Sequence, residues 1–167
     1  MKKNYEIKCK LDNYKNIKEL AGSLNFSYTV EKQVDIYYKV KSGRLKLRII
    51  NDKEANLIYY NRAERSNKRI SHYIISKTND FKELDNILRK QFEVLITVEK
   101  VREIYINKNI RIHLDRVKKL GSFLEIEIIY GNLAKAKKEM KGLIQFLKLN
   151  ENTFIRNSYS DLLNNKN

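Results

Sequence analysis

Polar and apolar residues alternate along many short stretches of the chain. In SGRLKLRI, residues 42–49, a cation at every second position alternates with leucine or isoleucine, and SFLEIEII, residues 122–129, repeats this rhythm with glutamate. A period of two predicts β-strands with one apolar and one polar face. Such stretches predict eight strands: Tyr5–Leu11, Tyr28–Val40, Arg44–Ile50, Asn56–Arg62, Arg69–Lys77, Val94–Ile106, Ile110–Val117 and Phe123–Tyr130.

Three other segments carry apolar residues at helical spacing. The first follows Asp12 or Asn13, the second follows Asn79 or Asp80, and the third spans 133–147. Asp and Asn are favoured helix N-caps, which supports the first two starts. The apolar stripes are Ile17, Leu20, Ala21 and Leu24; Phe81, Leu84, Ile87 and Leu88; and Ala136, Met140, Leu143 and Ile144. The tail NSYSDLL predicts a last helical turn, and residues 164–167 are expected to fray.

The order of these elements predicts an α+β fold. Short connections join the strands, as in antiparallel meanders, and no composition shift or linker divides the chain. Eight antiparallel strands in a chain of 167 residues tend to close into a barrel, because closure removes exposed edges. We therefore expect one domain, residues 1–163, built as an eight-stranded antiparallel β-barrel.

The helices determine which face of each strand points inward. Their apolar stripes must be buried, and the apolar strand faces are the large surfaces available for this. If the helices pack outside the barrel, the charged strand faces point into the lumen. That face carries Glu6, Lys8, Lys10, Arg44, Lys46, Arg48, Lys100, Arg102, Arg111, His113, Asp115, Glu125 and Glu127.

So many charges cannot be buried dry, because each would cost several kcal/mol without a partner. Such a lumen must hold water and ligands of both signs. Clustered carboxylates favour Mg²⁺ or Mn²⁺, and clustered Arg and Lys favour a ligand with several phosphates. The alternative is that these faces are simply solvated. The segregation of charge by strand favours the lumen, because an ordinary surface intersperses the two signs.

Composition limits the other interpretations. The formal net charge is +15, but lysine and asparagine are abundant throughout, and Lys-rich helices are expected to be solvated faces. No aromatic-bearing RNA-binding strand is evident, so a nucleic-acid partner is not favoured. The single cysteine, Cys9, is expected in the core of a protein from a reducing compartment. We see no signal peptide and no apolar run long enough for a membrane span, so we expect a cytoplasmic location.

An ordered set of motifs resembles the CYTH superfamily, the triphosphate tunnel metalloenzymes, and within it the class IV adenylate cyclases. The motifs are NYEIKCKL, QVDIYYKVKSGRLKLRI, LIYYNR, KRISHY, VEKVREIYI, IRIHLDRVKKLGSFLEIEI and NSYSDLL. Together they cover nearly the whole chain. The resemblance implies an eight-stranded tunnel with helices outside, a triphosphate bound inside it, a divalent cation and a homodimer.

The resemblance also implies roles for particular residues. Phosphate binding falls to Lys8, Arg44, Lys46, Arg48, Arg62, Lys100, Arg102 and Arg111, and metal binding to Glu6, Asp115, Glu125 and Glu127. Catalysis falls to Lys8, Glu125 and Glu127, with Mg²⁺ or Mn²⁺ as cofactor. One departure is Asn4, which stands where the family has a further Glu and so weakens the case for a second metal. Arg62 replaces a Lys common in the family.

Three further residues need separate weighing. His113 is expected to be a hydrogen-bonded barrel histidine rather than an acid–base group. Asp35 fits either a structural hydrogen-bond acceptor or a lumen carboxylate. Ser158 and Tyr159 match a family tail motif that is expected to close one end of the tunnel.

The sequence leaves three functions open. The first is a class IV cyclase reaction, ATP to cyclic AMP and pyrophosphate. The second is hydrolysis of tripolyphosphate, thiamine triphosphate or a nucleoside triphosphate. The third is a non-catalytic binder of a polyphosphate, a nucleotide or a nucleic acid. No residue specifies the base or a general base, although Lys8 is a candidate base if its pKa is depressed.

Overall fold

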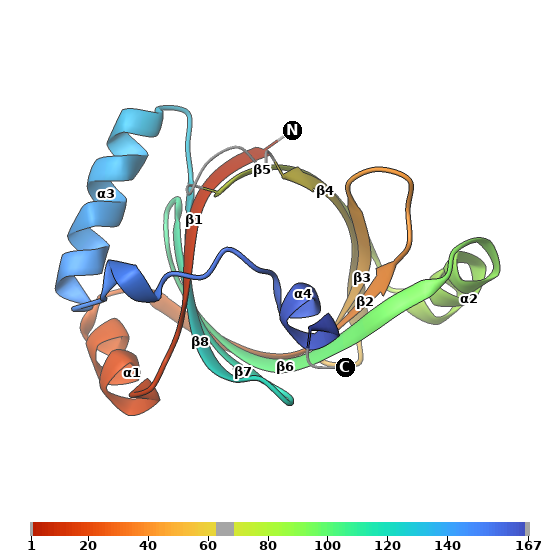
Figure 1. Cartoon of the computed structure of the whole chain (residues 1–167), viewed down its shortest axis with the longest axis horizontal. Coiled ribbons are helices and arrows are strands. Elements are labelled where there is room, and N and C mark those ends of the chain that lie inside the picture. The colour runs from red at the N-terminus through yellow and green to blue at the C-terminus, as the bar shows by residue number, and fades with distance from the viewer. Residues whose placement is uncertain (1, 63–68, 166–167) are drawn as a thin grey trace.

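The computed structural model describes residues 2–62 and 69–165 and contains a closed antiparallel barrel (Figure 1). Its strands are β1 (Lys2–Lys10), β2 (Ser27–Tyr38), β3 (Arg44–Ile50), β4 (Glu54–Arg62), β5 (Arg69–Thr78), β6 (Val94–Asn107), β7 (Ile110–Val117) and β8 (Gly121–Ile129). Around the barrel they run β1-β5-β4-β3-β2-β6-β7-β8, and β8 pairs back with β1. The predicted eight-stranded α+β barrel is confirmed.

The helices lie outside or across one end of this barrel. They are α1 (Tyr14–Ser23), α2 (Phe81–Gln91), α3 (Leu133–Phe146) and α4 (Tyr159–Asn164). Asn13 caps α1 and Asn132 caps α3 through their side chains, whereas Asp80 precedes α2 without a side-chain cap bond. A short 3-10 helix, Glu151–Thr153, was not predicted. No helix among the described residues is long and apolar enough to span a membrane.

The main hydrophobic core lies outside the barrel wall, between the strands and their covering helices. Leu114, Leu124 and Ile126 are fully buried on the outer face of β7 and β8. They belong to one cluster with Ala21 of α1 and Met140 of α3. A second outer cluster joins Tyr38 and Leu47 to Leu88 of α2. Because these apolar faces point outward, the polar faces of the same strands point inward.

The helix α4 lies across one end of the barrel in Figure 1. It begins with a capping box, in which Ser158 and Asp161 each bond to the other's backbone N–H. The ring of Tyr159 packs edge-on against Phe123, with 5.0 Å between ring centroids. Both rings belong to an apolar cluster with Tyr37, Tyr60 and Leu163. The tail is therefore helical as predicted, while residues 166 and 167 of the expected frayed end lie outside the described residues.

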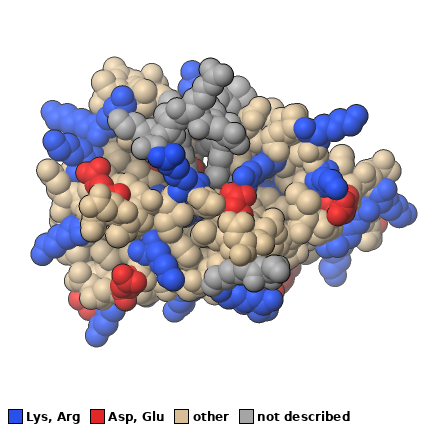
Figure 2. All heavy atoms as spheres, viewed as in Figure 1, with Lys and Arg blue, Asp and Glu red and all other residues tan. Residues whose placement is uncertain are grey.

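The exterior shows a different charge distribution from the interior. On the face seen in Figure 2, Lys and Arg side chains are scattered over the middle and the edge and do not form one continuous patch. Salt bridges on the outer surface, such as that between Lys118 and Glu99, join well-exposed side chains. Such pairs contribute little to stability. On this face the high net positive charge is therefore spread out rather than concentrated in a binding surface.

Candidate functional site

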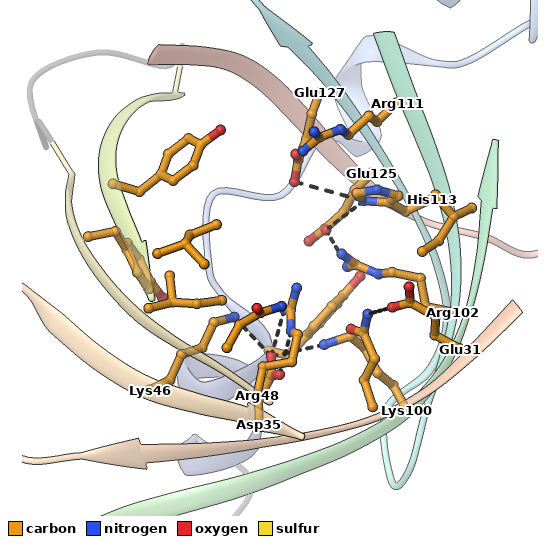
Figure 3. A pocket seen from close by; sticks show the side chains of 18 of the residues that line it. Glu31, Asp35, Lys46, Arg48, Lys100, Arg102, Arg111, His113, Glu125 and Glu127 are labelled. Atoms are coloured by element: carbon orange, nitrogen blue, oxygen red, sulfur yellow. Dashed lines mark hydrogen bonds and ion pairs between the residues drawn. The ribbon is translucent and has the colours of Figure 1, made fainter. Parts of the chain in front are cut away.

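The barrel encloses a cavity of about 470 Å³, here called the lumen. Its lining includes most of the charged residues that the strand pattern placed inward: Glu6, Lys8, Lys46, Arg48, Lys100, Arg102, Arg111, His113, Glu125 and Glu127. In Figure 3 the labelled members of this set, Lys46, Arg48, Lys100, Arg102, Arg111, His113, Glu125 and Glu127, converge from several strands toward the same space. The prediction of a charged lumen is confirmed for these positions.

Strand register explains how the acidic residues meet. Glu6 of β1 stands opposite Glu127 of β8, and Glu127 stands opposite Arg111 of β7. We call Glu6, Glu125 and Glu127 the glutamate cluster. Two carboxylates directly opposite each other on neighbouring strands repel. A cation between Glu6 and Glu127 would offset this repulsion. Asn4, which stands where the family has a Glu, donates a hydrogen bond to Glu6 over 3.3 Å.

Glu125 lies two positions before Glu127 on β8 and is held by two cations. Its oxygens lie 2.9 Å from Lys8 Nζ and 2.6 Å from an Arg102 nitrogen. Burial alone would raise its pKa, but Lys8 and Arg102 outweigh burial and hold the pKa well below its usual range. Glu125 is therefore ionised throughout the neutral pH range. Lys8 also donates to the backbone carbonyl of Asn157 over 3.3 Å.

A second group of charges surrounds Asp35 of β2. We call Lys46, Arg48 and Lys100 the basic cluster. The nearest oxygens of Asp35 lie 2.9 Å from Lys46 Nζ, 2.7 Å from Arg48 Nε and 3.0 Å from Lys100 Nζ. Burial works against ionisation of Asp35, yet the three cations hold its pKa well below its usual range.

The basic cluster has more positive charge than Asp35 can balance. Burial, aided by Arg48, Arg102 and Lys46 and opposed by Asp35, lowers the pKa of Lys100 to about 7. A buried lysine loses its proton when nearby cations make the charged form costly. An anion in the lumen would reverse this effect. The cluster is therefore suited to a polyanionic ligand.

The donor atoms of one group fit a divalent cation. A ring nitrogen of His113 and carboxylate oxygens of Glu125 and Glu127 all lie within 4.8 Å of one another. The Nδ1 atom of His113 is buried and makes no hydrogen bond to any described residue. Carboxylate oxygens are ligands that Mg²⁺ and Mn²⁺ favour, and imidazole suits transition ions. These residues therefore fit the predicted kind of cofactor.

The structure does not bring every predicted site residue into the lumen. Asp115 is fully buried beneath it, where its oxygens accept from Arg102 over 2.6 and 2.7 Å and from the Tyr159 hydroxyl over 2.7 Å. Arg44 is absent from the lumen lining and bonds instead to Ser158 and Asp161 at the start of α4. Lys10 is exposed. The side chain of Arg62 lies outside the described residues.

Sequence reasoning left the role of Asp35 open and missed an apolar strip in the lumen. Asp35 stands opposite Arg48 in the β2–β3 register. Residues that stand opposite each other on neighbouring strands point to the same face of the sheet, so the inward position of Arg48 also places Asp35 in the lumen.

The apolar strip of the lumen comprises Ile58 and Tyr60 of β4 and Tyr73 and Ile75 of β5. The Ile75 side chain is 46% exposed although it lines the lumen. Part of the lumen wall can therefore contact an uncharged group.

An eight-stranded antiparallel barrel with clustered cations and carboxylates inside has the architecture of the triphosphate tunnel proteins. The model of the CYTH domain matches residues 2–159, so the chain belongs to the CYTH family. The resemblance seen in the motifs is thereby confirmed over nearly the whole chain.

Individual relatives agree with this assignment. MJ0240 of Methanocaldococcus jannaschii, which is named as a candidate adenylate cyclase, is 28% identical to this chain. The matched region covers 94% of this chain and 96% of MJ0240. The structure of the PH1012 protein from Pyrococcus horikoshii has a TM-score of 0.86 and 26% identity, covering 97% of this chain and 99% of that one. The Hippeastrum protein HpAC1, described as having dominant triphosphatase activity, has a TM-score of 0.73, covering 99% of this chain and 96% of that one. At 12% identity the latter likeness shows the fold alone.

Proposed function

We propose that the protein is a divalent-metal-dependent enzyme that binds a nucleoside triphosphate in the lumen and acts as a class IV adenylate cyclase. The observation that carries this is the presence of two clusters of opposite charge in one cavity. The basic cluster suits phosphates and the glutamate cluster suits a divalent cation. Membership of the CYTH family and the likeness to MJ0240 support the same function.

The residues divide into two roles. Lys46, Arg48 and Lys100 hold phosphate oxygens from one side of the lumen, and Lys8, Arg102 and Arg111 hold them from the side of the glutamate cluster. Glu125 and Glu127, with Glu6 beside them, would hold Mg²⁺ or Mn²⁺. Such a cation neutralises charge on phosphate oxygens and stabilises charge that develops during transfer.

The chain's own contribution to the reaction is positioning and electrostatic stabilisation. In the cyclase reaction the ribose 3′-oxygen forms a bond to the α-phosphorus, the 3′-hydroxyl loses its proton, and pyrophosphate leaves. The lumen cations stabilise charge on the leaving pyrophosphate, because they are held in place before the reaction starts. Lys8 reaches Glu125 and faces the same space, so it can hold an oxygen near the cation.

The apolar strip favours a substrate that has an organic group besides its phosphates. Inorganic tripolyphosphate offers nothing for Ile58 and Ile75 to contact, whereas a ribose and base do. Hydrolysis of a triphosphate remains the second candidate, because the charged lining contacts phosphates whichever phosphorus reacts. The outcome depends on whether a 3′-hydroxyl or water lies next to the reacting phosphorus.

The decisive experiment is product analysis. The purified protein is incubated separately with ATP, thiamine triphosphate and tripolyphosphate, each with Mg²⁺ or Mn²⁺, and the products are resolved by chromatography. Cyclic AMP with pyrophosphate is the expected result. Orthophosphate would establish the triphosphatase instead. If no substrate turns over with either ion, the protein is a binder and the proposal is wrong.

A further inference from the structure

His113 lies where the proposed cation would be bound. It stands on β7 directly opposite Glu125 of β8 and lines the lumen at 5% exposure. Its Nδ1 atom lies 3.8 Å from an oxygen of Glu125 and 3.8 Å from an oxygen of Glu127. Figure 3 shows the imidazole beside both carboxylates. The ring was expected to be hydrogen-bonded, yet Nδ1 has no such partner among the described residues.

The distances distinguish a shared ion from a direct contact. A hydrogen bond between nitrogen and oxygen needs about 2.7–3.2 Å, so 3.8 Å is too long for one. Two ligands that each lie about 2.1 Å from one ion can be separated by up to about 4.2 Å. The separation between Nδ1 and each glutamate oxygen is thus too wide for direct bonding and suitable for a cation between them.

Of the two glutamates, Glu127 has its charge left for a cation, because Glu125 already accepts from Lys8 and Arg102. The Glu125 oxygen that lies 3.8 Å from Nδ1 also lies 2.6 Å from an Arg102 nitrogen, so a cation at this position shares that oxygen with the guanidinium. In the described part of the chain, the one basic side chain recorded within 4.0 Å of a Glu127 oxygen is His113, at 3.8 Å. A neutral imidazole carries a lone pair on one nitrogen. A buried ring nitrogen without a hydrogen-bond partner is costly, and coordination of its lone pair to a metal ion removes that cost.

We propose that His113 is a nitrogen ligand of the divalent cation held by Glu125 and Glu127, and that this ligand makes the site prefer Mn²⁺ to Mg²⁺. Mg²⁺ takes oxygen ligands, whereas first-row transition ions bind imidazole well. The inference rests on the proposed function, because it assumes a cation at the glutamate cluster. It adds the nitrogen ligand and the selectivity that this ligand confers.

Metal binding can be measured without turnover. Mn²⁺ and Mg²⁺ are titrated separately into wild type, His113→Gln and Glu127→Gln, and the heat of binding is recorded. We expect wild type to bind Mn²⁺ more tightly than Mg²⁺. His113→Gln should lose about tenfold or more in Mn²⁺ affinity, while its Mg²⁺ affinity changes less than about threefold. Equal loss for both ions would overturn the proposed selectivity.

Pulsed electron paramagnetic resonance on bound Mn²⁺ tests the ligand directly, because a coordinated imidazole gives a ¹⁴N coupling. The chain has two histidines, so His72→Gln is the matched control. We expect wild type and His72→Gln to show the coupling and His113→Gln to lose it. The wild-type spectrum needs no variant, so misfolding of a variant cannot obscure the answer.

The outcomes separate this inference from the proposed function. Mn²⁺ that binds wild type but shows no nitrogen coupling would overturn the role of His113 and leave an oxygen-ligated metal site intact. Coupling that survives in His113→Gln and disappears in His72→Gln would also overturn it. If Mn²⁺ does not bind, or if Glu127→Gln binds it as tightly as wild type, the metal site of the proposed function fails as well.

Discussion

Asp35, which the basic cluster surrounds, and Glu127 of the glutamate cluster both face the lumen, but these two carboxylates have different roles. Asp35 has three cations within 3.0 Å and serves to hold them in place. Among the described residues, Glu127 has only a histidine, at 3.8 Å, as a basic neighbour within 4.0 Å. Asp35 is therefore part of the scaffold and Glu127 is available to a ligand, whereas Glu125, which bonds to Lys8 and Arg102, combines both roles.

Asp115 extends this comparison. Its two oxygens are occupied by Arg102 and the Tyr159 hydroxyl, as in a scaffold carboxylate. Arg102 in turn bonds to Glu125. The glutamate cluster is thus fixed from below by an aspartate that does not enter the lumen lining. Substitution of one scaffold carboxylate and of one ligand carboxylate tests this difference.

Removal of the scaffold carboxylate should have the largest effect. Asp35→Asn leaves Lys46, Arg48 and Lys100 without their shared counter-charge, and removing one partner of a buried ion pair costs about 3–5 kcal/mol. We expect the free energy of unfolding in urea to fall by about this amount. Tripolyphosphate should restore part of it, since the anion can replace the lost charge.

The control for this prediction is Asp52→Asn. Asp52 pairs with Lys32, and both side chains are about two-thirds exposed. The control should change stability by less than about 0.5 kcal/mol. If Asp35→Asn is as stable as the control, Asp35 is not the scaffold of the basic cluster.

The ligand carboxylate should show the opposite behaviour. Glu127→Gln is expected to lower metal-dependent turnover at least about 100-fold, because charge stabilisation at the reacting phosphate is lost. Its free energy of unfolding should hardly change, since the removed charge repels Glu6 in the absence of metal. Glu125→Gln is a poorer test, because Glu125 also holds Lys8 and Arg102.

Glu99→Gln is the matched control for this variant. Glu99 lies on the same barrel but is well exposed and pairs with Lys118. Turnover and denaturation curves of both variants are compared with those of wild type. Unchanged turnover in Glu127→Gln would remove the glutamate cluster from the active site.

Loss of one phosphate-binding cation should weaken the binding of tripolyphosphate moderately and leave the binding of Mn²⁺ unchanged. Arg48→Gln removes a guanidinium that faces the lumen, and a hydrogen bond to a charged group contributes about 1.5–3 kcal/mol. We expect calorimetry to show tripolyphosphate affinity about tenfold or more weaker and Mn²⁺ affinity unchanged. A parallel loss of Mn²⁺ affinity would show that the two clusters are not separate binding sites.

Lys100 provides a pH-dependent test of the basic cluster. With a pKa lowered to about 7, it is mostly neutral at pH 8, and a bound polyanion raises that pKa. Binding of tripolyphosphate at pH 8 should therefore take up nearly one proton per site, and affinity should weaken as pH rises through 7. The uptake is measured by calorimetry in buffers of different ionisation enthalpy.

The comparison variant is Lys100→Arg, because arginine keeps its charge at this pH. Protons that tripolyphosphate itself gains or loses cancel in the difference between the two proteins. Equal proton uptake by wild type and Lys100→Arg would mean that Lys100 is already charged in the free protein.

The sequence was sufficient for the fold and for the orientation of the strands. The alternation of polar and apolar residues predicted β3 and β7 with the bounds that the structure shows. The helices must bury their apolar stripes against the apolar strand faces, and this predicted that the charged faces point inward. The short 3-10 helix was missed, because three residues carry no periodic signal.

The sequence could not distinguish scaffold from ligand carboxylates. Asp115 and Glu127 both lie on inward faces of neighbouring strands, and nothing in their local pattern separates them. The difference arises from Tyr159, which reaches Asp115 from 44 positions away in the chain. Such a contact depends on how α4 lies across the barrel end. Neither the spacing of polar and apolar residues nor the composition indicates how α4 lies across the barrel end.

Arg44 offers the smallest expected effect. It lies on the inward face of β3 with Lys46 and Arg48, but it bonds to Ser158 over 2.6 Å and to Asp161 over 3.0 Å. Arg44→Gln should therefore leave tripolyphosphate affinity within about twofold of wild type. Because Arg44 and Asp161 are each about one-third exposed, we expect a loss of only about 1 kcal/mol in the free energy of unfolding. A loss of phosphate affinity as large as that of Arg48→Gln would place Arg44 in the basic cluster and show that α4 moves aside when the ligand binds.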